Sequence, residues 1–107
     1  MHSLIIRERT DVARILGFLN HIHGDLRKLI LHYCRLGNKG SGLLANIVAL
    51  YPDLEVLSLE SCYPFPSAGY RVIPRLKKLC ELNLSYCKVD YIYVKTLETH
   101  VYVREHV

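Results

Sequence analysis

The stretch Leu54-Glu55-Val56-Leu57-Ser58-Leu59-Glu60-Ser61-Cys62 recurs in pattern twice more in this chain of 107 residues. Residues 26–34 and 79–87 align with it without gaps, and all three segments read L-x-x-L-x-L-x-x-C. Four fixed positions that occur three times indicate an internal repeat, which decides the fold before any single residue does. The repeat also explains why 18 of the 107 residues are leucine.

A fourth, degenerate copy begins at the first residue. Met1, Leu4, Ile6 and Arg9 fall on the four fixed positions when the pattern is moved back by 25 residues. A chain of this length has room for one domain or a short repeat array. We therefore expect a single repeat domain, with units of approximately 1–25, 26–53, 54–78 and 79–107, the last unit being degenerate.

Each repeated motif predicts a short strand followed by a turn. The alternation of leucines with variable residues has period two, which places the leucines on one face of the strand. The cysteine is expected to turn inward, because a small apolar residue with a weak S–H donor suits buried loop carbonyls.

Helices are expected after the first two strands. Thr10 or Asp11 can cap a helix with the apolar face Val12, Ile15, Leu16, Leu19 and Ile22, ended by Gly24. Ser41 can cap a second helix that carries Leu44, Ile47, Val48 and Leu50 and stops before Pro52.

The third and fourth units depart from this pattern. Residues 63–66 contain two prolines and should be extended, and a short helical stretch from Ser67 should end near Ile73, before Pro74. In the fourth unit, residues 91–94 and 101–103 are β-prone, and no fifth L-x-x-L-x-L follows.

The repeats resemble the leucine-rich repeat family, in particular its ribonuclease-inhibitor-like and cysteine-containing subclasses, whose units span 20 to 29 residues. The resemblance implies an α/β solenoid in a short horseshoe arc, with a parallel sheet on the concave face and helices or irregular segments on the convex face. It also implies a non-enzymatic module that binds another protein. Cysteine-bearing intracellular members often recognise substrates for ubiquitin ligases, although no F-box or elongin-binding box is present here.

The family's binding surface consists of the residues between and beside the strand leucines, together with the loops that follow. The loops repeat tyrosine and basic residues, which are common at interface hot spots. In the first unit the equivalent strand positions are Ser3, Ile5 and Arg7, and the last loop contributes Tyr86 and Lys88. The expected partner-binding residues are Lys28, Ile30, His32, Val56, Ser58, Glu60, Glu81, Asn83 and Ser85 on the sheet, and Tyr33, Arg35, Tyr63 and Phe65 in the loops.

Composition argues against several other classes. The net charge of +4 is spread along the chain, with seven Lys/Arg and four Asp/Glu in residues 1–53, and no basic run typical of nucleic-acid binding occurs. No apolar run approaches the roughly 20 residues of a membrane span, and the start of the chain does not read as a signal peptide. We expect neither a nucleic-acid nor a membrane partner.

The four cysteines favour a reducing intracellular compartment, cytoplasmic or nuclear. Cys34, Cys62, Cys80 and Cys87 lack the close spacing of zinc ligands, and the intervals of the first, second and fourth are those of the repeat. A buried thiol is inert, and no phosphate-binding or dinucleotide-binding glycine motif is present. We therefore predict no catalytic residue, metal or cofactor. Cys80 is expected to face solvent.

Two alternatives stay open beside the binding module. The chain could be a fragment or splice product of a larger repeat protein with a mainly structural role, since neither end shows a polar cap; such ends also predict self-association. A metal-binding or enzymatic protein that uses the cysteines and histidines is the least favoured alternative.

Overall fold

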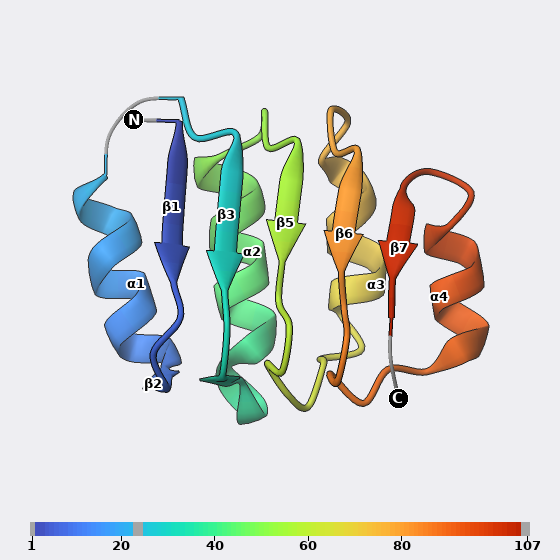
Figure 1. Cartoon of the computed structure of the whole chain (residues 1–107), viewed down its shortest axis with the longest axis horizontal. Helices are drawn as coiled ribbons and strands as arrows, with labels where there is room; N and C mark the ends of the chain where they lie inside the picture. Colours follow the sequence, from blue (N-terminus) through green and yellow to red (C-terminus); the bar gives the residue numbers. More distant parts are fainter. Residues whose placement is uncertain (1, 23–24, 106–107) are drawn as a thin grey trace.

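A five-stranded, all-parallel sheet forms the centre of the protein, as a computed structural model shows (Figure 1). The structure describes residues 2–22 and 25–105. The strands lie in the order β1-β3-β5-β6-β7, so each strand neighbours the next one along the chain in this sheet. A smaller parallel pair, β2 with β4, follows the first two strands. The strands are β1 (Ser3–Ile6), β2 (Thr10–Asp11), β3 (Lys28–Leu31), β4 (Cys34–Arg35), β5 (Val56–Ser58), β6 (Glu81–Asn83) and β7 (Tyr102–Arg104).

Helical segments connect each strand of the large sheet to the next, and consecutive helices contact one another. In Figure 1 α2 and α3 lie behind the sheet, and no helix crosses its front face. None of the helices in the described residues is long and apolar enough to cross a membrane. The helical segments are α1 (Val12–His21), η1 (Gly37–Lys39), α2 (Gly40–Leu50), α3 (Gly69–Val72), η2 (Ile73–Arg75) and α4 (Tyr91–Leu97).

The register of the sheet is the one that the repeats predict. Leu4 pairs with Leu29, Leu29 with Leu57, and Leu57 with Leu82. Apart from Leu4, which is half-buried at the outer strand, these side chains are fully buried and form a ladder beneath the sheet. The α/β class and the parallel sheet are therefore confirmed.

The repeated cysteines also turn inward, as predicted. Cys34, Cys62 and Cys87 are buried. The Cys62 thiol donates to the Leu31 carbonyl at 3.1 Å, and the Cys87 thiol donates to the Leu59 carbonyl at 2.8 Å. The thiols of Cys62 and Cys87 thus bond to a carbonyl at or just past the end of the preceding strand. These bonds link neighbouring units where the chain leaves the sheet.

The helix predictions were partly wrong at their ends. Asp11 caps α1 by accepting from the Arg14 N–H at 2.9 Å, as expected, while Gly24 lies outside the described residues. Ser41 does not cap α2, because a turn of 3-10 helix begins earlier, at Gly37, and leads directly into it. Leu50, expected on the apolar face, is 40% exposed at the end of α2, and the buried side chain there is that of Tyr51.

The third unit has two short helical segments, α3 and then η2. Pro74 lies inside η2, whereas it was expected to end the helical stretch near Ile73. Proline is tolerated there because η2 is only a single 3-10 turn and the first residues of a helix need no N–H acceptor.

The fourth unit corrects the prediction that residues 91–94 are extended. They begin α4, because the Asp90 carboxylate accepts from the Ile92 N–H at 3.0 Å and Val94 and Leu97 bury one helical face. Packing and capping therefore outweigh β propensity. The β-prone residues 101–103 do contribute to a strand, β7, which pairs in register with β6.

Candidate functional site

The front face of the sheet carries two adjacent columns of side chains, one from each outward position of the strands. Ser3, Lys28, Val56 and Glu81 form one column, and Ile5, Ile30, Ser58 and Asn83 form the next, as the repeat alignment predicted. We call this the open sheet face. The residues that line its hollow, of about 260 Å³, are Lys28, Ile30, His32, Val56, Leu57, Ser58, Glu60, Glu81, Asn83 and Arg104, of which Leu57 has its side chain in the ladder beneath the sheet.

A chain of polar contacts crosses the open sheet face. The Glu60 carboxylate accepts from the Asn83 amide at 3.5 Å and lies 4.0 Å from Nδ1 of His32. On the other side of the imidazole, Nε2 lies 3.4 Å from the hydroxyl oxygen of Ser58. The Asn83 carbonyl oxygen accepts the Ser85 N–H at 2.9 Å, which anchors the amide. These contacts hold His32 and Glu60 in place across three strands.

The order serine, histidine and carboxylate is also that of a nucleophile, its base and an orienting acid. Here the two separations, 3.4 and 4.0 Å, exceed the 2.6–3.2 Å of an activated pair. The Ser58 side chain is covered by its neighbours, since only 6% of the residue is exposed. These separations fit a polar network that orients the side chains and do not fit an activated nucleophile and base.

Two residues expected on the open sheet face are buried instead. Ser58 is too small to reach past Ile30, Asn83 and the imidazole of His32, so it forms the floor of the hollow. Ser85 is 0% exposed because β6 ends at Asn83, after which the alternation of the strand no longer holds. Its hydroxyl has no hydrogen-bond partner within the described residues.

Two residues of the open sheet face, both on β7, were missed. Tyr102 lies beside Glu81 in register and is 61% exposed. Arg104 of β7 lies beside Asn83 in register, and its guanidinium is 3.7 Å from the Glu81 carboxylate. Its strand begins 21 residues after the first residue of β6, and Val103 takes the register position of Leu82 while the repeat's other leucine positions are not kept. The alternation of Val101 and Val103 is the sequence signal that could have located it.

A second surface, along the loops that follow the strands, also differs in part from the prediction. Tyr33 and Tyr86 occupy equivalent positions in the left-handed region, with φ of 61° and 60°, and their counterpart in the third unit is Ser61, with φ of 59°. Tyr63 instead pairs with Arg35 in an isolated bridge. It therefore belongs to the column of Arg35 and not to that of the other two tyrosines.

Phe65 was expected at this edge but is buried, with 7% exposed. Its ring packs against Tyr70 with the centroids 4.8 Å apart. A Cβ added to Gly69 would lie 2.6 Å from the ring, so the glycine makes room for it. Phe65 is part of the core and not of a binding surface.

The thiols show why the cysteines are poor candidates for chemistry. All four are free, and only Cys80 is exposed. Burial raises the pKa of Cys34 and of Cys87 to about 11, and it raises that of Cys62 further. The thiolate is the nucleophile and metal ligand, so these groups are not activated. Within residues 2–22 and 25–105, no group of three His, Cys, Asp or Glu side chains could hold a metal ion.

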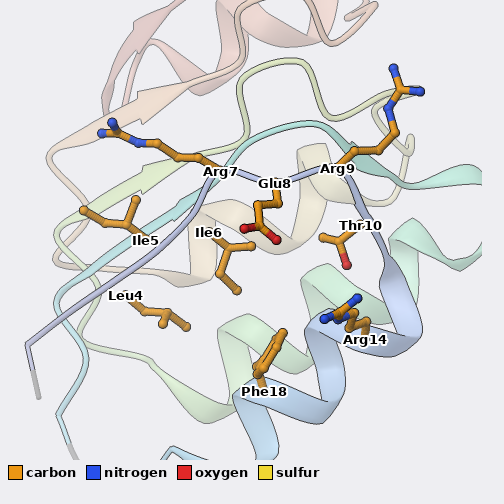
Figure 2. A pocket seen from close by; sticks show the side chains of 9 residues that line it. All are labelled: Leu4, Ile5, Ile6, Arg7, Glu8, Arg9, Thr10, Arg14 and Phe18. Atoms are coloured by element: carbon orange, nitrogen blue, oxygen red, sulfur yellow. The ribbon is translucent and has the colours of Figure 1, made fainter.

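Another hollow, of about 240 Å³, lies at the outer side of β1. Figure 2 shows Leu4, Ile6 and Phe18 directed into the space between β1 and α1, while Arg7 and Arg9 extend away from it. Phe18 is 44% exposed, with the guanidinium of Arg14 5.9 Å from its ring centroid. Self-association through this end stays a prediction.

Comparisons with protein-family models, with curated proteins and with solved structures found no significant match to this chain.

Proposed function

We propose that the chain is a leucine-rich-repeat solenoid of the ribonuclease-inhibitor-like, cysteine-containing subclass, and that it binds another protein through the open sheet face. The observation that carries this proposal is the hollow on that face, to which β3, β5, β6 and β7 all contribute outward side chains. In this interpretation the open sheet face is the concave face of a short horseshoe.

The composition of the face supports a protein ligand. Lys28 and Arg104 are balanced by Glu60 and Glu81, and Ile30 and Val56 supply apolar contacts between them. A non-obligate protein interface is only about as apolar as the rest of a protein surface, so a face that mixes aliphatic and polar groups fits one. Among the described residues, no Phe, Tyr or Trp lines the sheet hollow, so it lacks the rings on which single-stranded nucleic-acid binders most often stack bases.

A role in substrate recognition for a ubiquitin ligase, in a reducing intracellular compartment, is part of the same proposal. It depends on the family resemblance and on the free cysteines. The fragment alternative would assign these surfaces to a larger array of the same kind.

The test is affinity capture from cell extract with a double variant of the open sheet face, Lys28→Ala with Glu60→Ala. We expect recovery of the bound protein to fall at least about 10-fold, because truncation at an interface hot spot costs about 1–2 kcal/mol per residue. The matched control is Lys95→Ala with Glu98→Ala, two exposed charges of opposite sign on α4. Equal recovery with both double variants would refute the proposed site, provided that circular dichroism shows both to be folded.

A further inference from the structure

A row of tyrosines and basic side chains lies along the loops at the carboxyl ends of the strands. We call it the rim and define it by Arg9, Tyr33, Arg35, Tyr63 and Lys88. Four of these residues, together with Cys34 and Ser61, line a hollow of about 530 Å³. Tyr33 and Tyr63 are each half-exposed, so the rim presents two aromatic rings to solvent. This surface is separate from the open sheet face, whose hollow it does not share.

The repeat fixes the positions of the rim residues. Arg35 belongs to β4, which pairs with β2 immediately after Arg9, and a bridge joins Arg35 to Tyr63 in the next unit. Lys88 occupies the equivalent position in the fourth unit, and its ammonium nitrogen lies 5.0 Å from the centroid of the Tyr63 ring. From the second to the fourth unit this position therefore carries a cation, an aromatic ring and a cation. Its register partner in the first unit is Asp11, and Arg9 lies two residues before that.

The arginines of the rim are not held in ion pairs. Among the described residues, no carboxylate lines the hollow, and Arg9 and Arg35 take part in no ion pair. Asp11 neighbours Arg35 in register, but its carboxylate is directed to the Arg14 N–H as the cap of α1, and the Asp90 carboxylate caps α4. Guanidinium groups left in this state are suited to bidentate binding of carboxylates.

We propose that the rim binds an extended acidic segment of the partner protein, with two carboxylates three residues apart. Neighbouring strands lie about 4.8 Å apart, so Arg35 and Lys88, two units apart, are separated by roughly 10 Å along the rim. Three residues of polyproline II, an extended conformation with three residues per turn, span about 9 Å and bring the side chain back to the same face. One carboxylate then pairs with Arg35 and the other with Lys88, while the intervening residues lie over Tyr63. Arg9 adds a third cation at the near end.

This inference rests on the proposed function, since it names the chemistry of the partner of the same module. The experiment measures fluorescence anisotropy of a labelled peptide that contains Asp-Thr-Thr-Asp, at an ionic strength of about 50 mM, where exposed charges are weakly screened. We expect saturable binding of this peptide to the wild-type chain. The same peptide with both aspartates replaced by asparagine is expected to bind at least about 5-fold more weakly.

Variants of the chain identify the site. Arg35→Gln is expected to weaken binding of the acidic peptide about 5-fold. Tyr63→Leu, which removes the ring beneath Lys88, is expected to weaken it about 3-fold. The charge-matched control is Arg75→Gln, because Arg75 is an exposed arginine of η2, which precedes the opposite, amino end of β6. This control should change the affinity by less than about 1.5-fold.

Several outcomes would overturn the inference. They are absence of binding, equal affinity for the asparagine peptide, and an equal effect of Arg35→Gln and Arg75→Gln. A single-stranded oligonucleotide of equal charge that binds as tightly as the acidic peptide would assign the rim to nucleic acid instead. The Lys28→Ala and Glu60→Ala double variant should bind the peptide as the wild type does. The rim can therefore fail this test while the open sheet face still passes its own.

Discussion

Replacing Leu57 with alanine is expected to lower the free energy of unfolding by about 3 kcal/mol, within the 2–5 kcal/mol typical of buried leucines. Leu57 lies on the central strand, pairs in register with Leu29 and Leu82, and is 1% exposed. Its removal would leave a cavity beneath three strands at once. Because single domains are stable by only about 5–15 kcal/mol, this is a large fraction of the total.

Urea unfolding followed by circular dichroism measures the effect. The matched control is Ile92→Ala on α4, where the side chain is 76% exposed and a change of no more than about 0.5 kcal/mol is expected. If the alanine variant of Leu57 does not fold, Leu57→Ile provides a milder test, with a cost below about 1.5 kcal/mol. A cost below about 1 kcal/mol for Leu57→Ala would contradict the shared leucine ladder.

The second large effect is a loss of stability at alkaline pH. Burial raises the pKa of Cys34 and of Cys87 from 9.0 to about 11, and that of Cys62 in the same direction. Above pH 9 the unfolded chain therefore releases protons that the folded chain retains. Stability from these thiols is complete below the unfolded pKa and falls as the pH rises towards the folded one.

Above the unfolded pKa of 9.0, each thiol should contribute about 1.4 kcal/mol of this loss per pH unit, and below it very little. The three thiols together should therefore remove about 4 kcal/mol between pH 8 and 10, nearly all of it above pH 9. Urea unfolding at a series of pH values measures the slope. Cys62→Ala is expected to reduce the slope by about one third, whatever its stability at neutral pH, and Cys80→Ala, which removes an exposed thiol, serves as the control. A slope that Cys62→Ala leaves unchanged would be inconsistent with the buried thiols as its source.

The strands could be predicted from sequence because a single local pattern determines both their register and their buried face. The spacing of Leu29, Leu57 and Leu82 is enough to align the three central strands. The same holds for Cys62 and Cys87, whose thiols bond to carbonyls of the preceding unit. Residues that recur at a fixed period meet equivalent surroundings, so one correct assignment applies to all units.

The errors arose where tertiary packing replaces the local pattern. Tyr91 and its neighbours have β propensity, yet the Asp90 cap and burial of Leu97 make them helical. Phe65 was assigned to a surface because it and Tyr63 follow their strand as Tyr33 and Arg35 follow theirs, but Phe65 packs into the space that Gly69 leaves in the core. Ser58 follows the outward alternation of its strand and is still buried, because its larger neighbours cover it.

The two proposed surfaces differ in how their charges are arranged. The open sheet face holds paired charges such as Arg104 and Glu81, 3.7 Å apart. The rim holds basic groups beside exposed rings, such as Arg35 beside Tyr63. Charge that is unpaired on the protein raises the rate of encounter with an acidic partner, whereas packed contacts set the lifetime of the complex. A partner that uses both would bind the sheet with a folded surface and the rim with an extended acidic segment.

The most direct test of the central claim is site-specific photo-crosslinking in cell extract, with a photoreactive amino acid at Val56 in the middle of the open sheet face. Arg75, in η2, is the comparison site. The account predicts one cross-linked protein from position 56, its loss when Lys28 and Glu60 are replaced by alanine, and no such product from position 75. The same product from position 75, or its persistence in the double variant, would contradict the claim that this face binds the partner.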